Sequence, residues 1–350
     1  MIKTYKCPGC GASLIYAGGT EDLKCPHCDR TVPVSEIAEQ NNEAEVLAAG
    51  RAEDESRDNA GTNVREFQCP SCGAALVTTD HTSATQCAFC GAPTLIESRL
   101  TGEFKPGKIL PFRFDKAQAQ ENFKNWKGTG KLTPSSFKSA AVMDKVTGVY
   151  VPYWLYSYSC EADIFAEGTR TRIMEGQKER VIMTDHFNVQ RTSSAQYRGL
   201  PYEASTKIPE ETMAVLEPFD YDKLTDFSFP YLAGFQAEKY HFPASEMQER
   251  AREAVRQDLI NAAVADIDGY ESVSLLNANV RFLQEQADYA LLPVWTLNYE
   301  YMGKNYPLYM NGQSGEIDGE LPTSKFKLFL RFAIAFLICF GLAFLFGRIL

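Results

Sequence analysis

The stretch Cys7-Pro8-Gly9-Cys10, followed after fourteen residues by Cys25-Pro26-His27-Cys28, decides the fold of the N-terminal part of the chain. A Cys-x-x-Cys turn directs two thiolates toward one point, and a short hairpin brings a second such turn opposite the first. Four sulfurs then provide the tetrahedral coordination that Zn²⁺ accepts. We therefore expect a small zinc ribbon over residues 1–34 with the ligands Cys7, Cys10, Cys25 and Cys28.

The same pattern recurs at an offset of 62 residues. Its two pairs again stand fourteen residues apart, and Gly73 repeats Gly11, at the position after a metal knuckle where a positive φ is needed. We expect a second zinc ribbon over residues 67–98. Its ligands are Cys69, Cys72, Cys87 and Cys90.

Two other interpretations of the cysteines stay open. A disulfide framework needs an oxidising compartment, but no apolar signal sequence precedes Cys7. Tetrathiolate iron is the other alternative, because Cys-Pro-x-Cys-Gly loops also bind iron, although the fourteen-residue spacing favours zinc. We expect His27 to be a bystander, since four sulfurs already complete the shell. A closed site of this type stabilises a fold and performs no catalysis.

An acidic segment lies between the two predicted ribbons, and the net charge of the whole chain limits the class of partner. Residues 35–66 are rich in acidic side chains and predict a flexible acidic linker. The whole chain of 350 residues carries 35 Lys and Arg against 45 Asp and Glu, a net charge of −10. A nucleic-acid-binding protein needs a basic face for phosphates, so nucleic acid is not the expected partner.

Residues 104–322 predict an α+β body that is rich in antiparallel strands. Asp115 is a candidate cap for a helix that carries Phe123 and Trp126 toward the core. Another helix is expected to start at a capping box, Ser245 to Gln248. Its apolar face has helical spacing and comprises Met247, Ala251, Val255, Leu259 and Ala262.

Two segments of the body resemble each other at an offset of 141 residues, Val151–Tyr158 and Leu292–Tyr299. Both predict a strand with a proline near its start and with Trp and Tyr facing a core. The body is therefore expected to contain two related halves, with chance similarity as the alternative. Asn311-Gly312 predicts a tight hairpin turn.

The C-terminal tail is apolar without a break over residues 332–347. Extended back to residue 328, a helix here would be about 30 Å long, the thickness of a bilayer core. We expect a transmembrane helix at 328–348, with the lipid bilayer as a partner. Lys325, Lys327 and Arg331 lie on its N-terminal side and only Arg348 lies at the other end. This excess of positive charge predicts a single-pass protein of the cell membrane whose N-terminal bulk is cytoplasmic.

No catalytic motif is complete. Gly128–Thr133 lacks the earlier glycine and the hydroxyl residue of a phosphate loop, and Glu316 replaces the last glycine of a nucleophile elbow at Gly312–Gly315. We therefore expect no enzyme and no catalytic or cofactor-binding residue. An unrecognised enzyme within the body is an alternative.

The double ribbon and five further segments carry a resemblance to a known family. They are Ala84–Ala92, Gly148–Trp154, Leu216–Phe219, Tyr231–Phe235 and Met310–Gly315. With them the chain resembles the bacterial transcription-factor-IIB-type zinc-ribbon proteins with a C-terminal membrane segment, of the membrane-stress operon type. Some members carry names such as primosomal helicase or phage replisome organiser, although this chain has no nucleotide loop and its ribbons are not basic.

The resemblance implies metal ligation by the eight cysteines and implies no catalytic residue. It also implies a role in membrane stress, beside flotillin-like and phage-shock-protein-A-like proteins that it would recruit to the membrane. We expect a membrane-anchored zinc-ribbon adaptor for protein–protein interaction. A nucleic-acid-binding regulator is the alternative that the ribbon type suggests.

Overall fold

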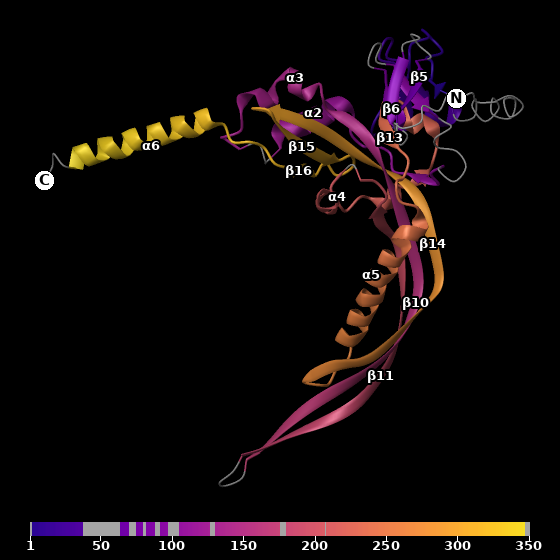
Figure 1. Ribbon diagram of the computed structural model, residues 1–350, viewed down its shortest axis with the longest axis vertical. Coiled ribbons are helices and arrows are strands. Elements are labelled where there is room, and N and C mark those ends of the chain that lie inside the picture. Colours follow the sequence, from indigo (N-terminus) through magenta and orange to yellow (C-terminus); the bar gives the residue numbers. More distant parts are fainter. Residues whose placement is uncertain are drawn as a thin grey trace, which may run out of the picture. The chain divides into compact units, whose positions relative to one another are not determined.

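The computed structural model describes residues 2–37, 64–69, 75–79, 82–87, 92–96, 105–126, 130–175, 180–206 and 208–346 (Figure 1). The chain divides into two compact units. Unit 1 comprises Met1–Val151, Thr206–Lys239 and Leu291–Leu350, whereas unit 2 comprises Pro152–Ser205 and Tyr240–Ala290.

The first ribbon is a three-stranded antiparallel sheet in unit 1. Its strands are β2 (Ile15–Tyr16), β3 (Asp22–Lys24) and β4 (Thr31–Pro33), in the order β2-β3-β4. Leu14 and Leu23 are fully buried and form its small core. The ribbon predicted at residues 1–34 is therefore present.

The second cysteine-containing segment is divided between two sheets. β5 (Val64–Gln68) and β6 (Ala75–Thr79) form an antiparallel pair of their own. β7 (Thr82–Gln86) and β8 (Pro93–Ile96) instead belong to the large sheet of the body, where β8 pairs with β1 (Ile2–Lys3). The predicted linker at 35–66 lies largely outside the described residues.

The large sheet runs in the order β1-β8-β7-β13-β10-β14-β15-β16. The further strands in this order are β13 (Gln236–Glu238), β10 (Thr147–Glu175), β14 (Ser272–Tyr301), β15 (Lys304–Asn311) and β16 (Ile317–Gly319). Beside this order, β11 (Arg180–Glu203) pairs with β10, and β9 (Lys108–Ile109) pairs with β12 (Thr225–Asp226). Both strands of the sequence repeat are present, at the start of β10 and the end of β14. The turn predicted at Asn311-Gly312 joins β15 to β16.

The core of unit 1 is aromatic. Phe112 stacks on Phe235 with a centroid distance of 4.3 Å, and Tyr150 and Trp295 meet Phe112 edge-on at 4.9 and 5.0 Å. Such pairs stabilise a core beyond the area that they bury. These four residues come from distant parts of the chain, so the cluster joins the segments of unit 1.

Short helices cover this unit: α2 (Lys116–Asn125), η3 (Ser135–Lys138), α3 (Ala140–Met143), α4 (Glu210–Leu216), η4 (Tyr221–Lys223) and η5 (Phe229–Leu232). The Asp115 side chain accepts a hydrogen bond from the Gln118 N–H at 2.8 Å, and the Gln118 side chain accepts one in return. The predicted cap is therefore confirmed, and Phe123 is buried as expected.

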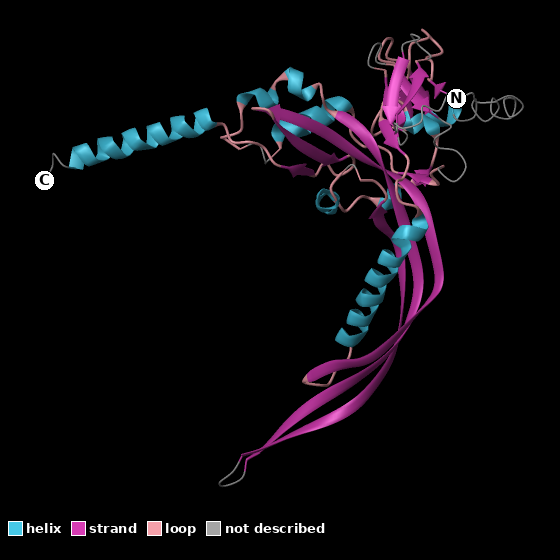
Figure 2. Cartoon of the chain, in the orientation of Figure 1, coloured by secondary structure: helices cyan, strands magenta, loops and turns pink. Residues whose placement is uncertain are grey.

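Unit 2 is built from long strands and one helix (Figure 2). β10 and β11 (Arg180–Glu203) form an antiparallel hairpin whose register runs from Tyr153↔Glu203 to Glu175↔Arg180. Every second residue of β10 from Tyr158 to Ala166 is buried, which is the period-two pattern of a strand with one covered face. The helix α5 (Ala244–Ala265) buries Ala251, Val255, Leu259 and Ala263.

The details of α5 correct two predictions. The helix starts at Ala244 after Pro243, without a side-chain cap, so the capping box at Ser245 is wrong. Ala263 is buried, whereas Ala262 is exposed. The spacing Leu259 to Ala263 continues the i, i+4 row of the buried residues, which keeps the apolar stripe on one face over the full length of the helix.

The C-terminal helix α6 (Lys325–Phe346) contradicts the membrane prediction. Among the residues that the structure describes, no helix is long and apolar enough to cross a membrane. Lys325, Lys327 and Arg331 occupy its first two turns.

Three expectations fall with this finding: a transmembrane helix at 328–348, a fold class that includes it, and a single-pass location in the cell membrane. Residues 347 and 348 of that segment lie outside the described residues.

Candidate metal centre

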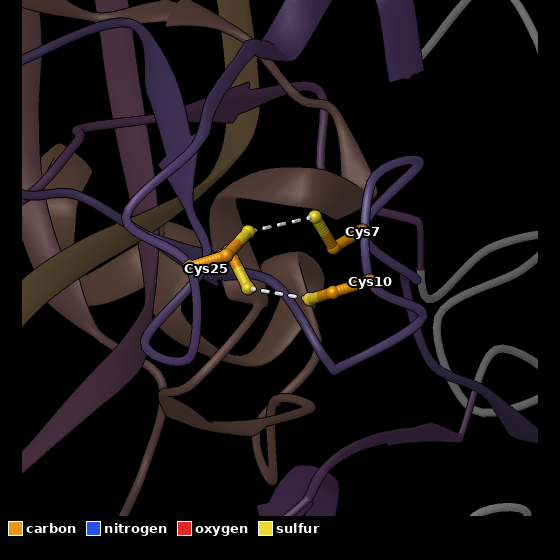
Figure 3. Close-up of side chains that lie close together, drawn as sticks. Cys7, Cys10 and Cys25 are labelled. Carbon is orange, nitrogen blue, oxygen red and sulfur yellow. Dashed lines mark hydrogen bonds between the residues drawn. The ribbon is translucent and has the colours of Figure 1, made fainter.

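The four cysteines of the first ribbon come together at one point. Their sulfur atoms all lie within 4.8 Å of one another, and Figure 3 shows Cys7, Cys10 and Cys25 directed inward. The Cys7 and Cys28 sulfurs are 3.6 Å apart, and those of Cys10 and Cys25 are 3.5 Å apart. A tetrahedron with Zn–S bonds of about 2.3 Å has edges of about 3.8 Å. The four cysteines can therefore hold a metal ion, as predicted.

Two turns with the same backbone hydrogen-bond pattern direct these four sulfurs toward one point. In the first, the Gly11 N–H donates to the Cys7 carbonyl at 2.9 Å and the Cys7 N–H donates to the Ala12 carbonyl at 2.7 Å. In the second, the Asp29 N–H donates to the Cys25 carbonyl at 2.9 Å and the Cys25 N–H donates to the Arg30 carbonyl at 2.8 Å. Each turn is thus closed by the same pair of backbone bonds.

The positive φ predicted for Gly11 is confirmed at 74°. The equivalent residue of the second turn is Asp29, with a φ of 57°. Sequence reasoning missed it because the glycine of the first turn has no counterpart here. Asp is among the few residues with a side chain that tolerate this conformation, so an Asp one residue after a Cys-x-x-Cys pair was the available signal.

The thiols of the cluster differ in their electrostatics: the pKa values of Cys7 and Cys25 are lowered, whereas hydrogen bonds among the sulfurs raise those of Cys10 and Cys28. The Gly9 N–H points at the Cys7 sulfur at 3.4 Å and is the main cause that lowers the pKa of this thiol to about 6. A thiolate is the form that binds metal. Cys7 and Cys25 are buried whereas Cys10 and Cys28 are exposed, so the cluster has a protected and an accessible side. His27 is not part of it, as expected.

The second predicted site is described in part. Cys69 and Cys87 are each 2% exposed and share one buried cluster with Ala92. The Cys87 N–H donates to the Ala92 carbonyl at 2.9 Å, the bond that Cys7 makes to Ala12 and Cys25 makes to Arg30. Cys72, Cys90 and Gly73 lie outside the described residues.

The first ribbon is docked on the body of unit 1. The Tyr16 N–H donates to the Ala233 carbonyl at 2.9 Å, and the Tyr16 and Tyr231 rings meet edge-on at 5.2 Å. A Cβ on Gly18 would lie 2.4 Å from the Phe114 carbonyl oxygen, so the ribbon approaches the body backbone too closely for a side chain. The pair Gly18-Gly19 was the sequence signal for this contact.

Comparison with known proteins gives one informative match. The chain is 34% identical over 328 residues to uncharacterized protein YdjG of Bacillus subtilis strain 168, covering 94% of this chain and 92% of that protein. No family model matches the sequence. No solved structure matches it. The resemblance to transcription-factor-IIB-type ribbon proteins remains a prediction.

Proposed function

The chain belongs to the family of Bacillus subtilis YdjG, and from this premise we propose that it is a non-catalytic, zinc-stabilised adaptor that binds another protein. The observation that carries the proposal is a cluster of exposed apolar side chains near the end of the β10–β11 hairpin in unit 2, next to the final pair Glu175–Arg180. We call this surface the hairpin tip; it comprises Ile173, Met174, Val181, Ile182 and Met183.

The hairpin tip is apolar on both faces. Ile173 pairs with Ile182 and Met174 pairs with Val181, and each of the four is at least 46% exposed. Paired residues share a face of a ribbon whereas consecutive residues point to opposite faces. One face therefore carries the isoleucine pair and the other carries Met174, Val181 and Met183. Exposed apolar clusters of this kind mark interaction sites.

A partner protein with an apolar groove fits this surface best. A flat partner surface would cover one face of a two-stranded ribbon and leave the other in water, whereas a groove covers both. Close to the tip, Arg172 and Asp185 form an ion pair at 2.5 Å, which suits the polar rim of such an interface. The family resemblance supplies flotillin-like and phage-shock-protein-A-like proteins as the first partners to test, in a stress response.

Zinc is the proposed metal in the first ribbon, and the second ribbon is proposed to hold another through Cys69, Cys72, Cys87 and Cys90. Four thiolates leave no open position for a substrate or water, which supports a structural role for both ions. The repeated Cys87–Ala92 backbone bond supports the second site. Iron remains the competing metal.

The test is cross-linking of the full chain in cells followed by identification of the captured proteins. The variant Ile173→Ser/Ile182→Ser removes apolar side chains from the hairpin tip without disturbing a buried contact. Leu276→Ser is the matched control, because Leu276 and Ile182 are both 63% exposed and both belong to unit 2.

The proposal expects one or a few partner proteins that the double variant loses and the control keeps. Capture of only a second copy of this chain, or equal capture by both variants, contradicts it.

A further inference from the structure

Unit 1 also contains a cavity that is separate from the cysteine cluster. It is a cavity of about 770 Å³ between the turn that follows β2 and the loop that follows β15. Cavities of about 300–1,000 Å³ are typical of small-molecule sites. The sequence did not predict this cavity.

Three aromatic residues form its inner wall. Tyr16, Phe112 and Tyr231 line the cavity, and each is at most 8% exposed. The rings of Tyr16 and Tyr231 offer apolar contact to the body of a ligand, and the face of a tyrosine ring attracts a cation. Burial raises the pKa of Tyr231, and the nearby Glu21 carboxylate raises it further. The aromatic wall therefore lies in the field of a negative charge.

Four charged residues line the cavity, and two of them neutralise each other. Lys223 and Asp220 form an ion pair at 2.7 Å. Glu21 has no cation partner among the described residues. Arg113 has no carboxylate partner there either: its guanidinium lies 5.6 Å from the Phe114 ring and makes one long contact, 3.5 Å, to the Gln313 carbonyl. The cavity thus offers one unpaired negative and one unpaired positive group.

The wall that carries Glu21 is fixed in place. The Tyr16 hydroxyl donates to the Thr20 carbonyl at 2.6 Å, and the Gly19 N–H donates to the Phe112 carbonyl at 2.8 Å. These bonds tie the turn both to the ribbon and to the body. Glu21 follows this turn directly, so its backbone is preorganised.

The opposite wall is fixed by Asn311, which is fully buried. Its side-chain carbonyl accepts from the N–H groups of Gln313 and Ser314 at 2.7 and 3.0 Å, and its Nδ2 donates to the Leu216 carbonyl at 2.8 Å. The segment Asn311–Gly315, which the sequence singled out, therefore shapes a loop that lines the cavity through Gln313 and Ser314.

We infer that this cavity binds a small zwitterion with an apolar body, of the amino-acid class. Its ammonium group pairs with Glu21 in front of the tyrosine rings, its carboxylate pairs with Arg113, and its side chain packs on the aromatic wall. The lining is neutral in sum, so a ligand with a single net charge leaves one of the two unpaired groups without a partner.

Isothermal titration calorimetry of the full, metal-loaded chain tests this with three probes of nearly equal size. Phenylalanine carries both charges, 3-phenylpropionate carries the negative one only, and phenethylamine carries the positive one only. We expect phenylalanine to bind with a Kd in the range of about 0.1–5 mM and each single-charge probe to bind at least about tenfold more weakly.

Two variants assign the charges. Arg113→Gln should bind phenylalanine no better than phenethylamine, and Glu21→Gln should bind it no better than 3-phenylpropionate. Arg198→Gln, in unit 2, is the control and should leave all three affinities unchanged. Absence of phenylalanine binding to the unaltered chain, or a single-charge probe that binds as tightly, overturns the inference. Thermal unfolding of each variant shows whether it is folded.

Discussion

The Gly19 N–H and the Phe112 carbonyl are joined by a hydrogen bond of 2.8 Å. Gly19 belongs to the metal-binding ribbon and Phe112 to the aromatic core of unit 1. The bond therefore links the ribbon directly to the residue on which Phe235, Tyr150 and Trp295 pack. The ribbon is part of the core architecture of unit 1, and this shapes the predictions that follow.

Gly18→Ala should destabilise the chain by about 1–3 kcal/mol, because the new Cβ would lie 2.4 Å from the Phe114 carbonyl oxygen and force the ribbon away from the body. Chemical denaturation measures the loss. Gly130→Ala is the control, since nothing lies within 4 Å of a Cβ there. Equal stability of the two variants would show that the close approach is absent in solution.

Asn311→Ala should cost about 2–4 kcal/mol, because it leaves the Leu216 carbonyl and the N–H groups of Gln313 and Ser314 without their partner in a buried site. Asn305→Ala, at an exposed position of β15, should change stability by less than about 0.5 kcal/mol. A small effect at Asn311 would mean that the loop keeps its shape without this side chain.

Unit 2 should lose stability in acid through Glu285. Its carboxylate accepts hydrogen bonds from Arg252 at 2.6 and 2.7 Å and from Gln248 at 2.9 Å. The hydrogen bond from Arg252 is the largest cause that lowers the pKa of Glu285 below its usual value, and the bond from Gln248 lowers it further. A pKa that is lower in the folded state gives stability that is present above the unfolded-state pKa and is lost as pH falls through the folded one.

Glu285→Gln should therefore be less stable than the parent chain at pH 7, by about 0.5–1.5 kcal/mol, and the difference should shrink toward pH 3. Urea unfolding followed at several pH values measures it. A difference that stays constant across this range would exclude titration of Glu285 as the cause.

The part of the fold that sequence predicted is the part that local chemistry determines. The Cys7–Cys28 spacing predicted the ribbon, and Asp115 followed by Gln118 predicted the start of α2, because both depend on neighbours in the chain. The docking of Tyr16 on Tyr231 could not be predicted, since it joins residues more than 200 positions apart. Neither the cysteine spacing nor the helix cap indicates that Tyr16 packs against Tyr231.

Strand length was missed for a different reason. β10, β11 and β14 contain 29, 24 and 30 residues, whereas the strands predicted from the repeat covered only Val151–Tyr158 and Leu292–Tyr299. Beyond Gly168, β10 is mostly exposed, so its side chains lose the strict alternation that marks a half-buried strand. The prediction of a transmembrane helix at 328–348 rested on composition alone, and no helix among the described residues is long and apolar enough to bear it out.

Loss of the first metal should disturb more than the ribbon. Cys7→Ser removes one ligand, and because Tyr16 and Gly19 dock on the body, we expect changes in the near-ultraviolet circular dichroism of the aromatic core as well. Cys339→Ser, at an exposed cysteine outside the cluster, is the control. A spectrum of Cys7→Ser identical to that of the control would mean that the ribbon folds without its metal or independently of the body.

The most direct test of the proposed metal centre is elemental analysis of the unaltered chain and of its Cys25→Ser variant, both purified anaerobically by the same procedure. We predict two zinc ions per chain and one fewer in Cys25→Ser. Cys160→Ser should keep both, because Cys160 is a buried residue of unit 2 and is not one of the four clustered cysteines. A chain without zinc or iron, or a Cys25→Ser variant with undiminished metal, would contradict the metal centre on which the account rests.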